Sequence, residues 1–110
     1  PMCLAFKANC EELGMPMDVA KPGGMYGSSD IGNVSIKMPA IHDYIPLCDD
    51  GIPSHNRAYT EQTDKPRADA VCLLGAKAIA MTVIDILEKP EFREEIYKYF
   101  NEQIPAEYKE

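Results

Sequence analysis

The sequence has no C-x-x-C pair and no two histidines at metal-ligand spacing. Its only histidines are His42 and His55, so the chain by itself has no metal cage. The four cysteines are scattered along the chain, and nothing indicates export. We therefore expect reduced, mostly packed thiols rather than a disulfide framework, and a cytoplasmic location.

Basic residues are also scarce. Eleven Lys and Arg face eighteen Asp and Glu, which gives a net charge of -7. This charge excludes the phosphate-neutralising surface that nucleic-acid binding needs, and an anionic membrane surface would repel the chain. The longest apolar stretch, Val71 to Leu87, is interrupted by Lys77 and Asp85, and we expect it to fall short of a membrane span. No segment resembles a signal peptide.

The composition is that of a soluble globular protein. The chain has 110 residues, of which 45% are hydrophobic and 26% are charged. This length allows one domain at most, and a chain this short buries only about two thirds of the surface that its unfolded form exposes. We expect a folded chain with a modest core.

Three helices are predicted from apolar spacing and end signals. Residues 2–13 form an amphipathic pattern that stops at Gly14, which is typical of a glycine C-cap. Residues 66–89 begin with a proline and are rich in Ala, Leu, Ile and Met, and residues 91–103 follow Pro90 as a charged surface helix. The apolar residues of the segment 66–89 cover more than one face, so this helix must be buried on several sides. A chain of this length can hardly supply that cover.

The remaining segments are shorter. One of Ser28, Ser29 and Asp30 should cap a short helix over residues 31–38. Residues 15–20 and 40–47 are predicted to be extended, and Pro46 places the second at a sheet edge or a strand end. Residues 21–24, Lys-Pro-Gly-Gly, predict a loop, and residues 48–65 a long polar loop of the kind that carries function.

The two histidines differ in context. A lone loop histidine is more often solvated or hydrogen-bonded than a ligand, and this interpretation is favoured for His42. His55 lies downstream of the predicted strand and upstream of the predicted buried helix. In an α/β sheet, functional loops occupy that position.

Three segments in order carry a resemblance to a known family. Residues 27–35 read Gly-Ser-Ser-Asp-Ile-Gly-Asn-Val-Ser, and residues 51–55 read Gly-Ile-Pro-Ser-His. An alanine-rich helix then ends in Ile-Leu-Glu-Lys-Pro-Glu at residues 86–91. From about residue 9 to residue 100, the chain resembles the zinc metallopeptidase and amidohydrolase superfamily of aminoacylases, carboxypeptidase-type enzymes and aminobenzoyl-glutamate hydrolase, the last being nearest.

The resemblance implies a fold and a function. The fold would be α/β, the C-terminal portion of a di-zinc exopeptidase-type α/β/α sandwich, with one or two strands and a long buried helix. Residues 1–110 would be one segment of a single catalytic domain whose N-terminal half and inserted dimerisation domain are absent. The intact parent would use zinc-activated water and a glutamate base to hydrolyse an amide bond of an N-acyl amino acid or aminobenzoyl-glutamate-like substrate.

The same resemblance assigns roles to single residues. His55 would bind one of the two zinc ions of the parent, while this chain alone would retain none and would be inactive. Ser29 and Asp30 would lie near the substrate, although a helix N-cap explains Asp30 at least as well. Gly51 is sufficiently explained by a turn. The Glu-Glu pairs at residues 11–12 and 94–95 fall on amphipathic helices and indicate solvated faces.

Two other functions stay open. The chain could be a non-catalytic interaction module that binds a protein partner through the apolar helix 71–87. It could also be a small enzyme that uses Cys48 or Cys72 with His55, although no pair of base and nucleophile is recognisable. For the hydrolase, the expected partners are the missing N-terminal part or another copy of the chain over the apolar helix, and a small amide substrate.

Overall fold

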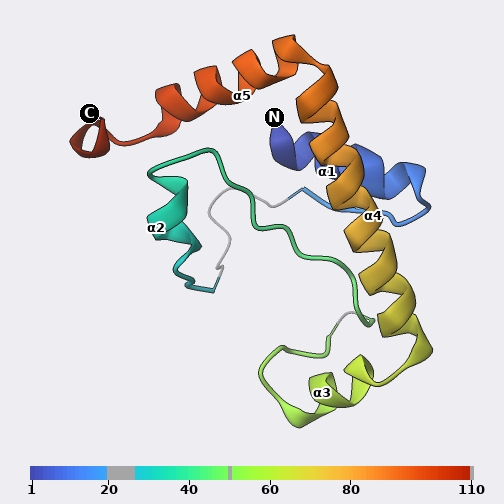
Figure 1. Ribbon diagram of the computed structural model, residues 1–110. Helices are drawn as coiled ribbons and strands as arrows, with labels where there is room; N and C mark the ends of the chain where they lie inside the picture. Colours follow the sequence, from blue (N-terminus) through green and yellow to red (C-terminus); the bar gives the residue numbers. More distant parts are fainter. Residues whose placement is uncertain (20–26, 50, 110) are drawn as a thin grey trace.

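The computed structural model describes residues 1–19, 27–49 and 51–109. In this part of the chain the regular structure is helical. The elements in order are α1 (Met2–Glu12), α2 (Ile31–Ser35), α3 (Arg57–Thr63), α4 (Pro66–Glu88), α5 (Pro90–Gln103) and a 3-10 turn, η1 (Ala106–Tyr108). Figure 1 shows the long helix α4 crossing α1, with α5 turning away from the end of α4 and α2 and α3 lying to the side.

Helix α1 confirms the predicted N-terminal helix and its glycine stop. Gly14 has a φ of +81°, and its N–H donates to the carbonyl of Glu11 at 3.0 Å. The N–H of Met15 donates to the carbonyl of Cys10 at 2.8 Å, which completes a Schellman motif. Met15 and Cys10 are both buried, so the motif also turns the chain back into the core.

The core lies where α1 crosses α4. The buried apolar residues are few and mostly small because a single helix pair supplies most of the cover, and Cys10 and Ala78 are fully buried. The cluster consists of Phe6, Cys10, Met15, Val71 and Ala78, with half-buried Leu13, Met17, Ile41, Ile45 and Leu74 around it.

Helices α4 and α5 match their predicted bounds within one residue, but α4 is not buried on several sides. Leu73, Ile84 and Leu87 expose 50 to 69% of their surface on the side of α4 away from α1. The expectation of a long buried helix is therefore wrong for the described chain, because no other described element packs on that face. The apolar composition that predicted burial is left facing solvent.

By length and composition α4 would be long enough to cross a membrane. It has 23 residues and a mean hydropathy of 2.0 over its most apolar window, of which 22% is buried. This corrects the expectation that the stretch falls short of a span. The core helix of a soluble protein passes the same test, so the result carries no conclusion about a membrane.

The predicted strand at residues 40–47 is extended, yet it is not a strand. Within the described chain no second extended segment pairs with it, and a strand exists only through the ladder of hydrogen bonds to a neighbour. Of the α/β fold that was expected, the described residues contain the helices but not the predicted one or two strands. Figure 1 shows this segment running from α2 across to the lower part of α4.

Three other predictions changed in detail. The short helix α2 ends at Ser35 instead of residue 38, and residues 15–19 form no regular structure. Residue 20 and the predicted loop 21–24 lie outside the described residues. The polar segment 48–65 contains a helix, α3, that the sequence analysis missed.

The shape is open for a chain of this length. The Cα radius of gyration is 15.8 Å, and the principal extents are 45, 31 and 20 Å. A compact domain of 110 residues has a radius of gyration of about 13 Å. The helices are therefore spread over more space than their own core fills.

Candidate functional site

The candidate zinc ligand His55 is exposed and held in an unusual backbone conformation. Its φ is +62°, the only positive φ among the described residues other than glycine. A non-glycine residue in this left-handed region is strained by roughly 1–3 kcal/mol, and such residues cluster at functional sites. No described group makes a hydrogen bond with its imidazole, so both ring nitrogens are available.

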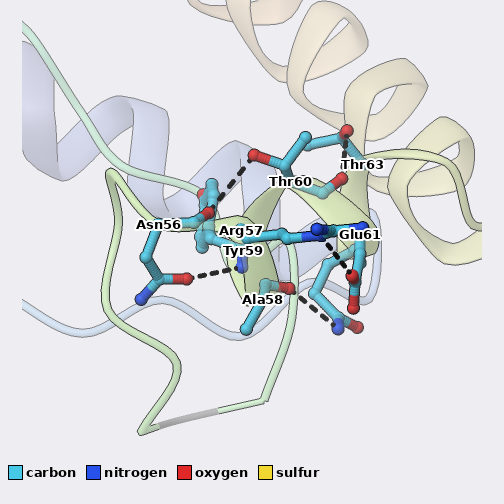
Figure 2. Close-up of polar contacts among 8 residues, drawn as sticks. Asn56, Arg57, Ala58, Tyr59, Thr60, Glu61 and Thr63 are labelled. Carbon is cyan, nitrogen blue, oxygen red and sulfur yellow. Dashed lines mark hydrogen bonds and ion pairs between the residues drawn. The ribbon is translucent and has the colours of Figure 1, made fainter.

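The residue after His55 fixes the start of α3. Asn56 is extended, with a φ of -139°, and its Oδ1 accepts a hydrogen bond from the N–H of Tyr59 at 2.9 Å. Figure 2 shows this cap together with the bond from Thr60 Oγ1 to the carbonyl of Asn56, 3.2 Å long. Asparagine is among the best N-cap residues. The change from the left-handed His55 to the extended Asn56 therefore places the imidazole directly before a capped helix.

Helix α3 is short, and its own side chains support it. Thr63 Oγ1 donates to the carbonyl of Thr60 at 2.7 Å, and Arg57 pairs with Glu61 at 3.4 Å, four residues on (Figure 2). Each of these contacts is exposed and contributes only a few tenths of a kcal/mol, ~0.3–0.5 for the ion pair. Asn56 followed by an Arg-Glu pair at i, i+4 was the signal in the sequence that could have revealed this helix.

The loop before His55 is tied to the start of α4. Asp49 accepts a hydrogen bond from Arg67 Nη1 at 2.5 Å, and this bond holds the pKa of the Asp49 carboxyl below its usual value. Gly51 has a φ of +92° and sits at a turn, as its sequence context predicted. The loop is therefore anchored at one end by Arg67 and at the other by α3.

The other predicted site residues lie with His42 in a different place. Ser29 and Asp30 line an open hollow of about 250 Å³ together with Ile31, Val34 and His42. Ser29 Oγ accepts from the N–H of Ile31 at 3.4 Å, whereas the Asp30 side chain makes no capping bond although it stands at the N-cap. His42 is exposed and stacks on Tyr44, with ring centroids 5.2 Å apart.

The described residues do not form a zinc site by themselves. No group of three or more His, Cys, Asp or Glu side chains is placed to hold a metal ion in the described ranges. His55 offers one nitrogen, while a stable zinc site needs about three or four ligands. The glutamates at positions 11, 12, 94 and 95 are exposed, and Glu11 pairs with Lys7 on α1. The roles assigned to His55, Ser29 and Asp30 stay predictions.

A half-buried carboxylate is the polar feature that the sequence analysis missed. Burial raises the pKa of Asp43, against the opposing effect of a hydrogen bond from the Cys3 thiol. Its Oδ2 atom is buried and has no hydrogen-bond partner among the described residues. Burial, followed by the charge of Asp43, also raises the pKa of Cys3. The raised pKa of Cys3 favours the protonated thiol, which is the form that donates the hydrogen bond to Asp43.

Comparisons with known proteins connect the chain to peptidases. It is 36% identical over 108 residues to the mouse (Mus musculus) Xaa-Arg dipeptidase, a match that covers 96% of this chain and 25% of the mouse enzyme. The human (Homo sapiens) Xaa-Arg dipeptidase is 34% identical over 105 residues, which are 94% of this chain and 24% of the enzyme.

The chain thus spans about a quarter of the length of the curated relatives that it matches. No family model matches the chain, and no solved structure does. Its similarity to the two dipeptidases supports a relationship with peptidases and, more broadly, with hydrolases.

Proposed function

We propose that this chain is the C-terminal part of the catalytic domain of a zinc-dependent metallopeptidase or amidohydrolase. The observation that carries the proposal is its 34 to 36% identity with two dipeptidases over nearly its whole length. The ordered motifs at residues 27–35, 51–55 and 86–91 are in keeping with it. The chain covers a quarter of those enzymes, so the remaining catalytic machinery would come from the rest of the polypeptide.

His55 is the residue of this chain that would bind metal. Its imidazole is exposed and unpartnered among the described residues, and its strained backbone is typical of a functional position. Zinc, when the complete site binds it, supplies a Lewis acid for amide hydrolysis. The chain alone offers one ligand, so we expect it to be inactive and to retain no zinc.

The names of the two relatives support a proposal for the substrate class. Both are named for dipeptides with a C-terminal arginine, which are small molecules with one amide bond between two residues. We propose that the intact protein cleaves the amide bond of a small N-acyl amino acid of this kind, in which the acyl group is an amino acid. Aminobenzoyl-glutamate is the second substrate to test.

The test uses the protein assembled from this chain and the polypeptide encoded upstream of it. His55→Ala should lower kcat/KM by at least about a hundredfold, the loss that follows removal of a group essential to metal binding. Tyr97→Ala is the control, since Tyr97 on α5 is 59% exposed and lies outside the residues to which the resemblance assigns a role. Equal activity of both variants would contradict the role of His55, and hydrolysis by the bare 110-residue chain would contradict the incomplete-enzyme proposal.

One observation favours a second candidate function. The exposed apolar residues of α4, with Leu87 69% and Leu73 59% exposed, would suit a non-catalytic module that binds a protein partner. In that case His55→Ala would leave binding unchanged, whereas Leu73→Glu with Leu87→Glu would abolish it. In the hydrolase the same double variant should prevent assembly and therefore activity.

A further inference from the structure

We propose that the cavity between α1, residues 39–43 and α4 binds a small molecule with an apolar body and a single cationic head, and that the head lies against Asp43. The cavity has a volume of about 440 Å³, which is in the range of small-molecule sites. Ser29, Asp30 and His55 are not among its lining residues. The inference therefore goes beyond the proposed function and does not depend on it.

The walls of the cavity supply the apolar half of the site. Phe6 comes from α1, Ile41 from the extended segment, and Ile79, Val83 and Ile86 come from α4. Ile79 and Val83 still expose 58% and 47% of their surface. A ligand that covers these side chains removes apolar area from water, which is a main source of affinity in such sites.

Three polar side chains, His42, Asp43 and Thr82, line the same cavity. Thr82 is already satisfied, because its Oγ1 accepts from Asn9 and donates to the carbonyl of Ala78. His42 stacks on a neighbouring tyrosine ring. Asp43 differs, since its buried Oδ2 accepts no hydrogen bond among the described residues. A buried acceptor without a donor is costly, so Asp43 is the group that gains most from a ligand that brings one.

The carboxylate of Asp43 also lacks a counter-charge. Neither Lys nor Arg lines the cavity, and Asp43 forms no ion pair with a described side chain. Burial raises the pKa of Asp43, although a hydrogen bond from Cys3 and the charge of His42 oppose this effect. A cationic head at the cavity wall would neutralise the carboxylate and form a charge-assisted hydrogen bond with it.

Charge selects a cation over the other possible occupants. A purely apolar occupant, such as the apolar face of a second copy, would cover the carboxylate of Asp43 without supplying a donor, which costs free energy. An anion would be repelled by Asp43 and by the net charge of -7. A single positive charge on an apolar body matches both the walls and the carboxylate.

The walls of the cavity are fixed by contacts that lie outside it. Gly75 of α4 is buried, and a Cβ atom built on it would lie 2.9 Å from Ile45 Cδ1. The absent side chain lets Ile45 lie close against α4, which holds the segment that carries Asp43. The bond between Asn9 and Thr82 joins α1 to α4. The site is therefore formed before a ligand arrives, so binding requires little ordering.

The experiment is an NMR titration of the 110-residue chain with phenylbutylammonium. Phenylbutanol and phenylbutanoate are the matched probes, because they keep the apolar body and replace the cation with a neutral or an anionic group. Phenylbutylammonium should shift the methyl signals of Ile41, Ile79 and Val83. Its Kd should be at least about tenfold lower than the Kd of either other probe, which is the gain from one charge-assisted hydrogen bond.

A pair of variants isolates the carboxylate. Asp43→Asn removes its charge, so the preference for phenylbutylammonium over phenylbutanol should fall below about threefold. Asp69→Asn removes the same charge from an exposed residue of α4 that does not line the cavity, and it should keep the preference of the wild type. Loss of the preference in both variants would indicate general attraction to an acidic chain and would overturn the site.

A further variant tests the cavity without changing Asp43, whether or not Asp43→Asn folds. Val83→Trp fills the cavity from its exposed wall and leaves the carboxylate in place. It should weaken the binding of phenylbutylammonium at least about tenfold. Leu73→Trp places the same side chain at an exposed position of α4 outside the cavity and should bind like the wild type.

Three results would contradict the proposal. They are equal affinities of the three probes for the wild-type chain, an Asp43→Asn chain that keeps the full preference, and probe-induced shifts at Leu73 and Leu87 in place of the cavity residues. The titration uses the chain by itself and measures no hydrolysis, so its outcome is separate from that of the test of peptidase activity.

Discussion

Asn9 on α1 and Thr82 on α4 form a buried polar bridge between two helices that are 73 residues apart in the sequence. Asn9 Nδ2 donates to Thr82 Oγ1 at 3.0 Å and to Asp85 Oδ2 at 3.0 Å, and Thr82 Oγ1 donates to the carbonyl of Ala78 at 2.8 Å. Asn9 and Thr82 are 7% and 5% exposed. Because buried polar groups are costly unless paired, this bridge fixes how α1 is placed on α4.

Asn9→Leu should destabilise the chain by about 1–3 kcal/mol, since it leaves the Thr82 hydroxyl without its Asn9 donor in a buried place. The free energy of unfolding from urea denaturation measures this loss. Asn101→Leu on the exposed face of α5 is the control and should change stability by less than ~0.5 kcal/mol. Equal losses in the two variants would contradict a structural role for the bridge.

The half-buried Asp43 predicts a specific pH dependence. Burial raises its pKa in the folded chain, so the folded state holds the proton more tightly than the unfolded state does. A carboxyl of this kind lowers stability when it is ionised, and stability is regained as the pH falls through its raised pKa. Asp43→Asn should therefore melt at a higher temperature than the wild type at pH 7, and this difference should shrink toward pH 4.

If Asp43→Asn melted at a lower temperature than the wild type at pH 7, the ionised carboxylate of Asp43 would be stabilised in the folded chain. Asp85→Asn is the matched comparison because hydrogen bonds from Lys89 and Asn9 lower the pKa of Asp85. Asp85 therefore contributes stability above its unfolded pKa, near 3.9, that is lost as the pH falls through its lowered folded pKa. The loss of stability in Asp85→Asn should therefore shrink only as the pH falls below the unfolded pKa of Asp85.

Gly75 should tolerate one added carbon but not a branched side chain. Gly75→Ala gains about 1 kcal/mol of helix propensity, and the Cβ meets the movable tip of Ile45. We expect a net change in unfolding free energy within ~1 kcal/mol. Gly75→Val should cost about 1–3 kcal/mol, because it pushes Ile45 and its segment off α4. A neutral Gly75→Val in thermal denaturation would show that the segment does not lie close to this helix.

The strained backbone at His55 predicts that glycine stabilises the isolated chain. His55→Gly removes the left-handed penalty and should raise the free energy of unfolding by about 0.5–1 kcal/mol. His55→Asn should be close to neutral, since asparagine tolerates this conformation, and both variants should be inactive in the assembled enzyme. If His55 were instead the best residue for stability at this position, His55→Gly would lower the melting temperature of the chain, which thermal denaturation would detect.

The sequence predicted the helices well because their end signals are local. The glycine stop at Gly14, the proline at residue 66 and Pro90 between two helices act within a few residues of where they stand, and all three appear in the structure as expected. Helix α3 was missed because Asn56, its cap, lies in a polar segment with Gly and Pro residues that predict a loop.

Local signals could not predict whether residues 40–47 form a strand or whether the long helix α4 is buried. Both outcomes depend on contacts with segments that are distant in the sequence. Residues 40–47 have the alternation of a strand but no ladder partner in the described chain, and α4 has the composition of a core helix but no cover on one side. The candidate site shows the same dependence. His55 is accessible, yet the side chains that would complete a metal site are not among the described residues.

Native mass spectrometry combined with elemental zinc analysis tests the central claim most directly. The purified chain should appear without zinc, and on mixing with the polypeptide encoded upstream it should form a heteromeric species that carries two zinc ions, while His55→Ala should lower this zinc content. Zinc held by the 110-residue chain alone would contradict the account, because its described residues would then contain ligands that the structure does not bring together.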